Sequence, residues 1–281
     1  MESDQNTAYA TRDYLHQVDW RQTATYALGI GATRQELAYL YEAMGPKVYP
    51  TFAVVPAFPA VVDVVSQAGG GFDNLVHAGQ RVVIHAPIPA EGVLRTVGRL
   101  EGKYDLKRMA QVVASTQTWK DEQLVAETTW TLLLFDRGGF GGPRPPKTTK
   151  VETPAGQDPD FVALEHTSPE QSLLYRLSGD TNPLHVDAEF AKKLGFPQGP
   201  ILHGLCTFGF LARAVIRNLC EGQGERLRSI EAQFKRPVWP GETLVSQGWR
   251  IGEGRVALSL EVKERDEKVL GNAWAEIEQG R

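Results

Sequence analysis

Alternating hydrophobic and polar positions mark short strands in both halves of the chain. In the first half the pattern runs through "VLRTVGRL", "AQVVASTQTW" and "QLVAETTWTLLLF". In the second half it runs through "LVSQGWRI", "VALSLEVKER" and "VLGNAWAEIE". Alternation buries one face of a strand and solvates the other, and such strands at turn-separated intervals favour an antiparallel sheet. The sequence therefore predicts an antiparallel sheet in each half.

Capping residues and helical spacing predict a few helices between these strands. Thr33 and Glu36 form a capping-box pair in "GIGATRQELAYLYEA", Ser168 begins a helix that Gly179 can end, and Asp187 caps "DAEFAKKLG". The longest candidate is "GLCTFGFLARAVIRNLCEG", whose apolar residues form one stripe. We expect each half to be a sheet wrapped around one central helix.

A segment rich in Gly, Pro and charge divides the chain, since "FDRGGFGGPRPPKTTKVETPAGQDPD" lacks an apolar period. We predict an N-terminal domain at residues 1–135, a linker at 136–160 and a C-terminal domain at 161–281. The halves echo each other: "LVHAG" resembles "ILHGL", which pairs His77 with His203, and "APIPAEGVL" resembles "RPVWPGETL". The echo indicates an internal duplication.

Composition and charge exclude several classes of function. The net charge is -4 and the sequence has no basic tract, which disfavours a nucleic-acid partner. We recognise no run of about 18 apolar residues and therefore expect no membrane span. The start "MESDQNTAYATRDYL" lacks the apolar core of a secretory signal, and the end "EIEQGR" is not a peroxisomal signal. On one helix Cys206 and Cys220 would lie roughly 21 Å apart, too far for a disulfide. We expect a reduced, cytoplasmic protein.

The stretch "YRLSGDTNPLHVDAEF" places Asp180, Asn182 and His185 within six positions. They lie in the short connection between two predicted helices, and Pro183 fixes one backbone dihedral of that loop. A stiff loop can hold an acid–base pair at a set separation. Because Asp and Asn are also common turn formers, a purely structural polar turn is the alternative.

The same stretch also has some features of a metal site. His185 and Asp187 are spaced as a ligand pair, and His203 could supply a third ligand. Asp187 is better explained as a helix cap, however, and no cysteine or acidic cluster completes a site. We therefore expect no metal.

"GPILHGLCTFGF" places the peptide N–H of Gly204 at the start of the longest predicted helix. The first N–H groups of a helix have no intrahelical partner, and the helix dipole there favours negative charge. Glycine also lets the backbone approach a ligand closely. Such an N–H could stabilise the enolate-like oxygen that forms when water adds to an α,β-unsaturated thioester.

Together these motifs resemble the type 2 enoyl-CoA hydratases of the MaoC-like dehydratase family. The resemblance rests on "YRLSGDTNPLHVDAEFAKKLGF" and "PILHGLCTFGF", and extends to "YALGIGA", "LVHAGQRVVIHAPIPAEGVLRT" and "KRPVWPGETL". It implies an α+β double hotdog fold, with a degenerate N-terminal hotdog and a catalytic C-terminal one. It further implies a homodimer that reversibly adds water, syn, to trans-2-enoyl-CoA to give (3R)-3-hydroxyacyl-CoA, with no metal or redox cofactor.

The resemblance also implies roles for individual residues. Asp180 and His185 would be the catalytic pair, Asn182 would orient the water or the pair, and Gly204 would be the oxyanion donor. Positions that contact substrate in the family correspond to His77, Ala78 and Phe234, and either Lys107, displaced by one place, or Arg108 would serve the CoA phosphates. The family usually has His-Gly in place of His77–Ala78, and its Asp-Lys-Gly run is replaced here by "YDLKRMAQ". These departures weaken the assignments of Ala78 and Lys107.

The apolar stretch "YPTFAVVPAFPAVVDVV", residues 49–65, fits two interpretations. It could be a core strand and turn. It could instead line a widened acyl-chain tunnel, opened because the first half no longer carries its central helix in full. On the second interpretation, bulky substitutions at Val54 or Phe58 should harm long or ring-bearing acyl substrates more than crotonyl-CoA.

Two rival functions share the predicted fold. A hotdog acyl-CoA thioesterase would use an acidic residue to drive attack on the thioester carbonyl itself. The histidine that follows Asp180 by five residues, with an asparagine between, favours hydration instead. A non-catalytic acyl-CoA-binding subunit is disfavoured because the Asp180–His185 pair is present.

Overall fold

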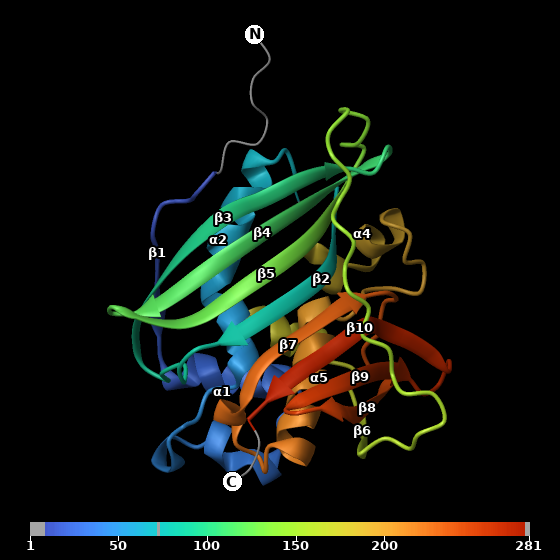
Figure 1. The fold of residues 1–281 in the computed structure, drawn as a ribbon. Helices are drawn as coiled ribbons and strands as arrows, with labels where there is room; N and C mark the ends of the chain where they lie inside the picture. Colours follow the sequence, from blue (N-terminus) through green and yellow to red (C-terminus); the bar gives the residue numbers. More distant parts are fainter. Residues whose placement is uncertain (1–8, 72–73, 279–281) are drawn as a thin grey trace.

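Ten antiparallel strands form one sheet in the computed structural model, which describes residues 9–71 and 74–278 (Figure 1). The order across the sheet is β1-β3-β4-β5-β2-β7-β10-β9-β8-β6. The strands are β1 Tyr14–Val18, β2 Leu75–Ile84, β3 Gly92–Asp105, β4 Met109–Lys120, β5 Gln123–Phe135, β6 Phe161–His166, β7 Leu227–Phe234, β8 Thr243–Gly252, β9 Arg255–Val262 and β10 Glu267–Ile277.

The two halves repeat one topology and meet at the centre of the sheet. Strands β2 and β7 pair directly, with Gly79 opposite Gln233 and Val83 opposite Ser229. Within each half the strand that follows the long helix lies at this junction, and the first strand lies at the outer edge. The echo of "APIPAEGVL" in "RPVWPGETL" fits this repeat, because these segments join β2 to β3 and β7 to β8. The pairing of His77 with His203 was wrong, since His77 lies in β2 and His203 precedes a helix.

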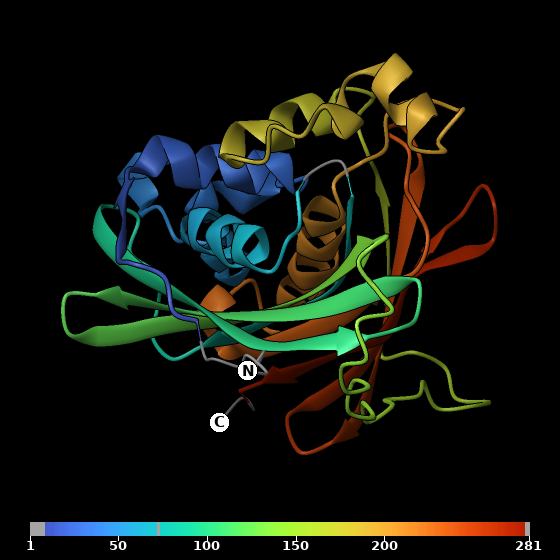
Figure 2. The same ribbon diagram turned by 90° about the horizontal axis from the view of Figure 1, so that it is seen from above.

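The helices gather on one face of the sheet (Figure 2). The α-helices are α1 Trp20–Gly29, α2 Val54–Gln67, α3 Gln171–Tyr175, α4 Ala188–Lys193 and α5 Gly204–Leu219. Single 3-10 turns are η1 Arg34–Tyr39, η2 Glu42–Met44, η3 Pro50–Ala53, η4 Arg176–Ser178, η5 Pro183–His185 and η6 Gly224–Arg226. Helix α5 is buried along nearly its whole length. Two half-sheets, each covering its own long helix, make the α+β double hotdog that the sequence predicts.

The stretch at residues 49–65 is helical, which corrects the strand interpretation and the premise that the first half lacks a full central helix. Pro50 occupies the first turn of η3, and α2 follows at once. The N-terminal half therefore has a complete central helix of its own, formed by this stretch. A short apolar run cannot distinguish a buried strand from a buried helix by its period, and burial overrides the low helix propensity of its valines.

The same segment bears on the expectation about apolar runs. Pro50–Gln67 is long and apolar enough to cross a membrane by length and composition alone, and 61% of that stretch is buried within the fold. Thr51, Asp63 and Ser66 interrupt the stretch, so it is not a continuous run of 18 apolar residues, and the absence of a membrane span stays a prediction. Its buried face, which includes Ala57, Val61 and Val64, packs in the core beneath the N-terminal half-sheet, as the core helix of a globular protein does.

The predicted caps are mostly confirmed, and they fix the loops around α3 and α4. Asp187 caps α4 by accepting a hydrogen bond from the Phe190 N–H at 2.9 Å, and Gly179 adopts a φ of +117°. The capping box of Thr33 and Glu36 is also present. It begins a 3-10 turn, however, where the pattern favoured an α-helix.

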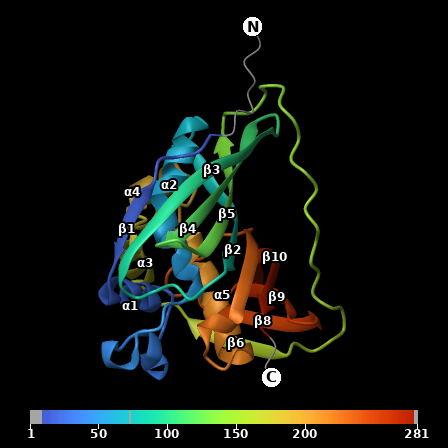
Figure 3. The ribbon, with the colours of Figure 1, turned by 60° about the vertical axis from the view of Figure 1, so that its left-hand side comes forward.

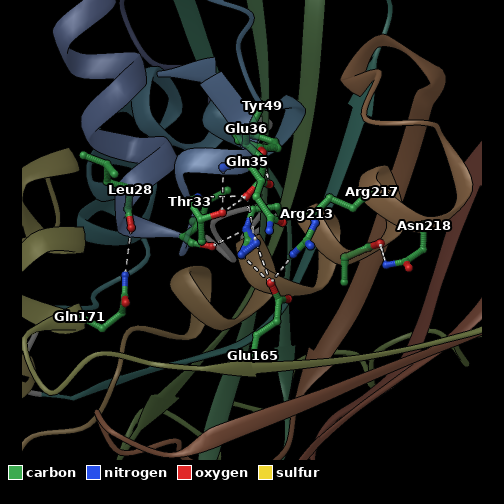
Figure 4. A network of polar contacts seen from close by, with 12 residues as sticks. Leu28, Thr33, Gln35, Glu36, Tyr49, Glu165, Gln171, Arg213, Arg217 and Asn218 are labelled. Atoms are coloured by element: carbon green, nitrogen blue, oxygen red, sulfur yellow. Dashed lines mark hydrogen bonds and ion pairs between the residues drawn. The ribbon is translucent and has the colours of Figure 1, made fainter. Parts of the chain in front are cut away.

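A buried ion network ties the N-terminal half to α5 (Figure 4). Arg213 of α5 lies 2.6 Å from the Glu165 carboxylate of β6 and 3.6 Å from that of Glu36. All three side chains are buried, and the Tyr49 hydroxyl donates to Glu36 at 2.7 Å. Because isolated buried charges are very unfavourable, the network holds η1, β6 and α5 in one arrangement.

Residues 136–160 join the halves as an extended segment that stands apart from the helices (Figure 3). This described stretch contains no helix or strand. The Asn272 side chain in β10 accepts a hydrogen bond from the Val151 N–H at 2.7 Å and so fastens the segment to the sheet. We retain the predicted domain limits, 1–135 and 161–281, as a prediction, with β5 ending at Phe135 and β6 beginning at Phe161. Both cysteines are free and buried, as predicted.

Candidate active site

The loop between α3 and α4 holds three polar residues in a fixed shape. Asp180 accepts a hydrogen bond from the Asn182 N–H at 3.1 Å, and the Asn182 side-chain oxygen accepts one from the Leu184 N–H at 3.0 Å. These bonds make two successive Asx turns. They occupy the amide oxygen of Asn182 and leave its NH₂ group as the donor that can face a ligand.

His185 ends this loop as a buried, neutral base. Its Nδ1–H donates to the Ile201 carbonyl at 2.9 Å, which leaves Nε2 with a bare lone pair in the neutral ring. Burial lowers the pKa of His185, although the nearby Asp180 carboxylate opposes that shift. Near neutral pH the ring therefore offers an acceptor at Nε2 beside an acidic side chain.

Gly204 begins α5, as the sequence predicts, and His203 is the residue before it. No acceptor pairs with the Gly204 N–H among the described residues. A Cβ at this position would lie only 3.1 Å from the ring of Phe234. Any larger residue would have to displace the ring, so glycine fits best at the start of the helix, and the N–H remains available to a bound anion.

His77 reaches the same place from the N-terminal half. Its ring stacks on Trp130 with centroids 5.0 Å apart and lies 4.8 Å from the ring of Phe234. The His77 Nε2–H donates to the Gly79 carbonyl at 3.0 Å, next to an irregularity in the pairing of β2 with β5. Burial lowers the pKa of His77 to about 4, so the ring is neutral.

One cavity of about 520 Å³ joins these groups. Polar groups from the Asp180–His185 loop lie at its border together with Gly204. Most of its wall is apolar and comes from both halves, including Phe58, Val61, Val65, Leu75, Trp130, Leu132, Leu202, Leu205 and Phe234. An apolar cavity with a few converging polar groups is the usual form of a small-molecule site.

The cavity includes most of the residues singled out from the sequence. Asp180, Asn182 and His185 border it, as do Gly204, His77 and Phe234. The remaining three residues are not in its wall. Ala78 is the next residue of β2, Lys107 is exposed at the β3–β4 turn, and Val54 is buried in the core. Phe58 therefore fits the proposed tunnel, whereas Val54 does not.

His203 is the residue whose position sequence reasoning missed. The sequence patterns suggested it only as an echo of His77 and as a metal ligand, yet its ring stacks on that of His185 with centroids 3.6 Å apart and 25° between the planes. Its Nε2–H donates to the main-chain carbonyl of Asp180 at 3.1 Å. The motif "ILHGL" could have pointed to His203, because a residue directly before a buried helix start is held rigidly.

Asp180, His185 and His203 lie close enough to be considered as a metal site. One ring nitrogen of each histidine and one oxygen of Asp180 lie within 4.8 Å of one another. A metal lies near the plane of each imidazole that binds it, whereas two stacked planes do not meet at a shared point beside the rings. The arrangement therefore fits tetrahedral Zn²⁺ poorly.

Comparisons with known proteins agree with this geometry. The MaoC like domain model matches residues 150–272, and the MFE-2 hydratase 2 N-terminal domain model matches residues 16–138. 3-Hydroxyacyl-thioester dehydratase Y of Mycobacterium tuberculosis is 41% identical over 258 residues, which cover 88% of this chain and 87% of that protein. Peroxisomal enoyl-CoA hydratase 2 of Arabidopsis thaliana is 36% identical, with 95% of this chain and 93% of that protein covered.

A solved structure extends the likeness to the whole fold. The crystal structure of a MaoC-like dehydratase from Phytophthora capsici superimposes with a TM-score of 0.87 at 30% identity. The match covers 97% of this chain and 96% of that one. Sequence and fold thus agree over nearly the full length, and the chain belongs to the MaoC-like dehydratase family.

Proposed function

We propose that the protein catalyses the reversible syn addition of water to trans-2-enoyl-CoA, giving (3R)-3-hydroxyacyl-CoA. One observation carries the proposal: Asp180, His185 and Gly204 border the same apolar cavity, and the bond from Nδ1 of His185 to Ile201 leaves its Nε2 bare. The enoyl-CoA hydratases and the thioester dehydratase among its relatives support the choice of substrate class.

The site offers partners for one water molecule. A water can donate one hydrogen to the Asp180 carboxylate and the other to Nε2 of His185, while it accepts from the NH₂ group of Asn182. As the water oxygen bonds to C3, one proton passes to the pair. The pair then returns one proton to C2, so the enzyme ends the cycle as it began.

The Gly204 N–H supplies electrostatic stabilisation in this scheme. Negative charge develops on the thioester oxygen as C3 is attacked, and an N–H at a helix start is already oriented to receive it. In comparable sites the loss of one such donor costs about 3–4 kcal/mol of transition-state stabilisation. The donor and the pair thus act on opposite ends of the enoyl thioester system.

The apolar wall favours an acyl chain over a polar substrate. Phe58, Val61 and Val65 of α2 contribute to it from the N-terminal half. We infer that this half holds the acyl group while the C-terminal half carries the chemistry. We further propose a cytoplasmic homodimer that needs neither a metal nor a redox cofactor, and CoA enters only as part of the substrate.

The decisive experiment incubates the purified protein with crotonyl-CoA and a longer enoyl-CoA. Loss of the ultraviolet absorbance of the conjugated thioester is followed in parallel with the release of free CoA thiol. If the protein is a hydratase, the absorbance falls and no free CoA thiol is released. Release of CoA at a matching rate would instead identify a thioesterase, and binding without either change would identify a non-catalytic acyl-CoA-binding protein.

A further inference from the structure

His203 is placed to control the proposed catalytic pair without touching the substrate. It is only 1% exposed, and it is absent from the wall of the cavity that Asp180 and His185 border. Its ring is enclosed between His185 and Tyr175, with the Tyr175 centroid 5.0 Å away. A buried histidine in this position acts on the site only through its neighbours.

The hydrogen bonds of His203 define its protonation. A carbonyl oxygen can only accept, so Nε2 carries the hydrogen that it donates to Asp180. Nδ1 is therefore bare, and it has no hydrogen-bond partner in the described part of the chain. Burial is the main cause that holds the pKa of His203 well below its usual value, and the ring stays neutral.

Two contacts link His203 to the two members of the pair. The bond from the His203 Nε2–H holds the backbone of Asp180. Asp180 directly follows Gly179, whose positive φ takes the chain out of helical geometry. The stacked ring covers one face of His185 and excludes water from it. Loss of the first contact should loosen Asp180, and loss of the second should let water reach His185.

We propose that His203 is a positioning residue of the hydratase centre, which holds the Asp180 backbone through its Nε2–H and keeps His185 dry by ring stacking. The inference rests on the proposed function, because it assigns a role to His203 in that reaction. It goes beyond the family motif, in which Asp180 and His185 are the acting pair and Gly204 the donor.

The other charged and titratable groups around His203 affect the pKa values of the two histidines in opposite directions. Asp180 lies on the loop and favours a protonated His185, whereas Arg176 of η4 disfavours a charged His203. Tyr175 of α3 has its own pKa raised by burial and stays neutral. Because burial keeps His203 neutral near neutral pH, it changes the pKa of His185 by shielding it from water.

Two substitutions separate the two contacts. His203→Phe keeps a flat ring against His185 but removes the N–H that holds Asp180. His203→Gln keeps an N–H donor but removes the stacked ring. We expect the Phe variant to lose kcat by on the order of ten- to a hundred-fold, as when a group that orients a catalytic residue is lost, with little change in KM.

The Gln variant should respond differently. Water gains access to His185, so the penalty on its charged form falls and its pKa rises. The acid limb of kcat/KM should therefore move to higher pH in His203→Gln and stay in place in His203→Phe. Smaller loss of kcat in the Gln variant than in the Phe variant would show rescue by the retained donor.

Histidine ¹⁵N NMR titration supplies a readout that does not depend on turnover. In the wild-type protein the His185 signal should report a bare Nε2 down to a pH below 6.5, the usual value for histidine. His203→Gln should shift that titration upwards. If both variants keep the wild-type kcat and titration, or lose kcat only in proportion to a fall in Tm, the role of His203 is refuted. Absence of hydration by the wild-type protein, with the titration as expected, would refute the proposed function alone.

Discussion

Among single residues, Asp180 contributes most to the proposed catalysis. Asp180→Asn keeps an oxygen that can accept from the Asn182 N–H, so the loop should retain its shape. The substitution removes the negative charge that assists proton transfer. We expect kcat to fall by about 10²- to 10⁴-fold, the usual contribution of general acid–base catalysis, with Tm unchanged.

Asp187 provides a matched control on the same loop. It is exposed and caps α4, and Asn is as good a cap as Asp. Asp187→Asn therefore makes the same chemical change a few residues away and should leave both kcat and Tm near wild-type values. Similar losses in the two variants would show that net charge, and not Asp180 itself, controls activity.

His185 sets the pH dependence at this scale. Activity needs Nε2 without a proton, and burial lowers the pKa of His185. Since the folded-state pKa lies below the usual value of about 6.5, activity should persist as the pH falls through 6.5 and fail only further down. The pH profile of kcat/KM measures this, and an acid limb at or above pH 6.5 would contradict it.

The residues of the loop were predictable, but their electrostatic state was not. The run from Asp180 to His185 is local in sequence, and Gly179 and Asp187 mark the ends of the flanking helices. The bare nitrogen of His185 depends instead on a bond to Ile201, which lies sixteen positions away. Such tertiary hydrogen bonds leave no mark in a sequence pattern.

At the scale of elements, the start of α5 must stay open for a bound oxygen. Gly204→Ala would place a Cβ 3.1 Å from Phe234 and push the ring or the helix start aside. We expect kcat to fall on the order of tenfold, less than the 10²- to 10³-fold that loss of a whole donor costs. Tm should stay near the wild-type value, because the higher helix propensity of Ala offsets the cost of moving the Phe234 ring by a few tenths of an ångström.

Gly209, in the same helix, gives the contrasting variant. A Cβ there would lie 2.3 Å from Ile30 in the core, so Gly209→Ala should lower Tm through overpacking. The Gly209→Ala protein that does fold should have the kcat of the wild-type enzyme. If Gly204→Ala lowered Tm and left kcat intact, the open helix start would be a packing requirement only.

Helix α2 limits the space in the cavity that is available to the acyl group. Phe58 borders the cavity, and Phe58→Trp adds volume to that wall. We expect kcat/KM to fall more for long or ring-bearing enoyl-CoA esters than for crotonyl-CoA, which serves as the internal control. Equal losses across a graded panel of substrates would place the acyl group elsewhere.

This helix also shows what the sequence could not decide. Its prolines and β-branched residues favour strand and turn. Pro50 and Pro56 lie near helix starts, where missing N–H groups cost little, but Pro59 lies inside α2 and removes a helical hydrogen bond. Burial against the sheet outweighs the remaining propensity. By contrast, α5 has a continuous apolar stripe and a clear start, so its extent followed from the pattern.

In the whole molecule, the ion network around Arg213 holds η1 of the N-terminal half against α5 and β6 of the C-terminal half. Arg213→Met would leave the buried carboxylates of Glu36 and Glu165 without their main partner. We expect a loss of about 3–5 kcal/mol in the free energy of unfolding, measured with urea, because a buried charge is left uncompensated.

Arg217 is the control for this change. It contacts the same Glu165 carboxylate at 3.3 Å, but its side chain is 37% exposed. Arg217→Met should therefore cost less than about 1 kcal/mol, as exposed pairs do. Equal losses for the two variants would mean that Arg213 is not the main partner of these buried carboxylates.

The arrangement of the whole molecule fixes the face of the substrate that reacts. Asp180 and His185 belong to one short loop and border one cavity, so the hydroxyl group and the proton should reach the double bond from the same face. The direct test is hydration of a trans-2-enoyl-CoA in D₂O, followed by determination of the configuration at C2 and C3. The account predicts a (3R)-hydroxyl with deuterium added syn to it, and an S product or anti addition would contradict it.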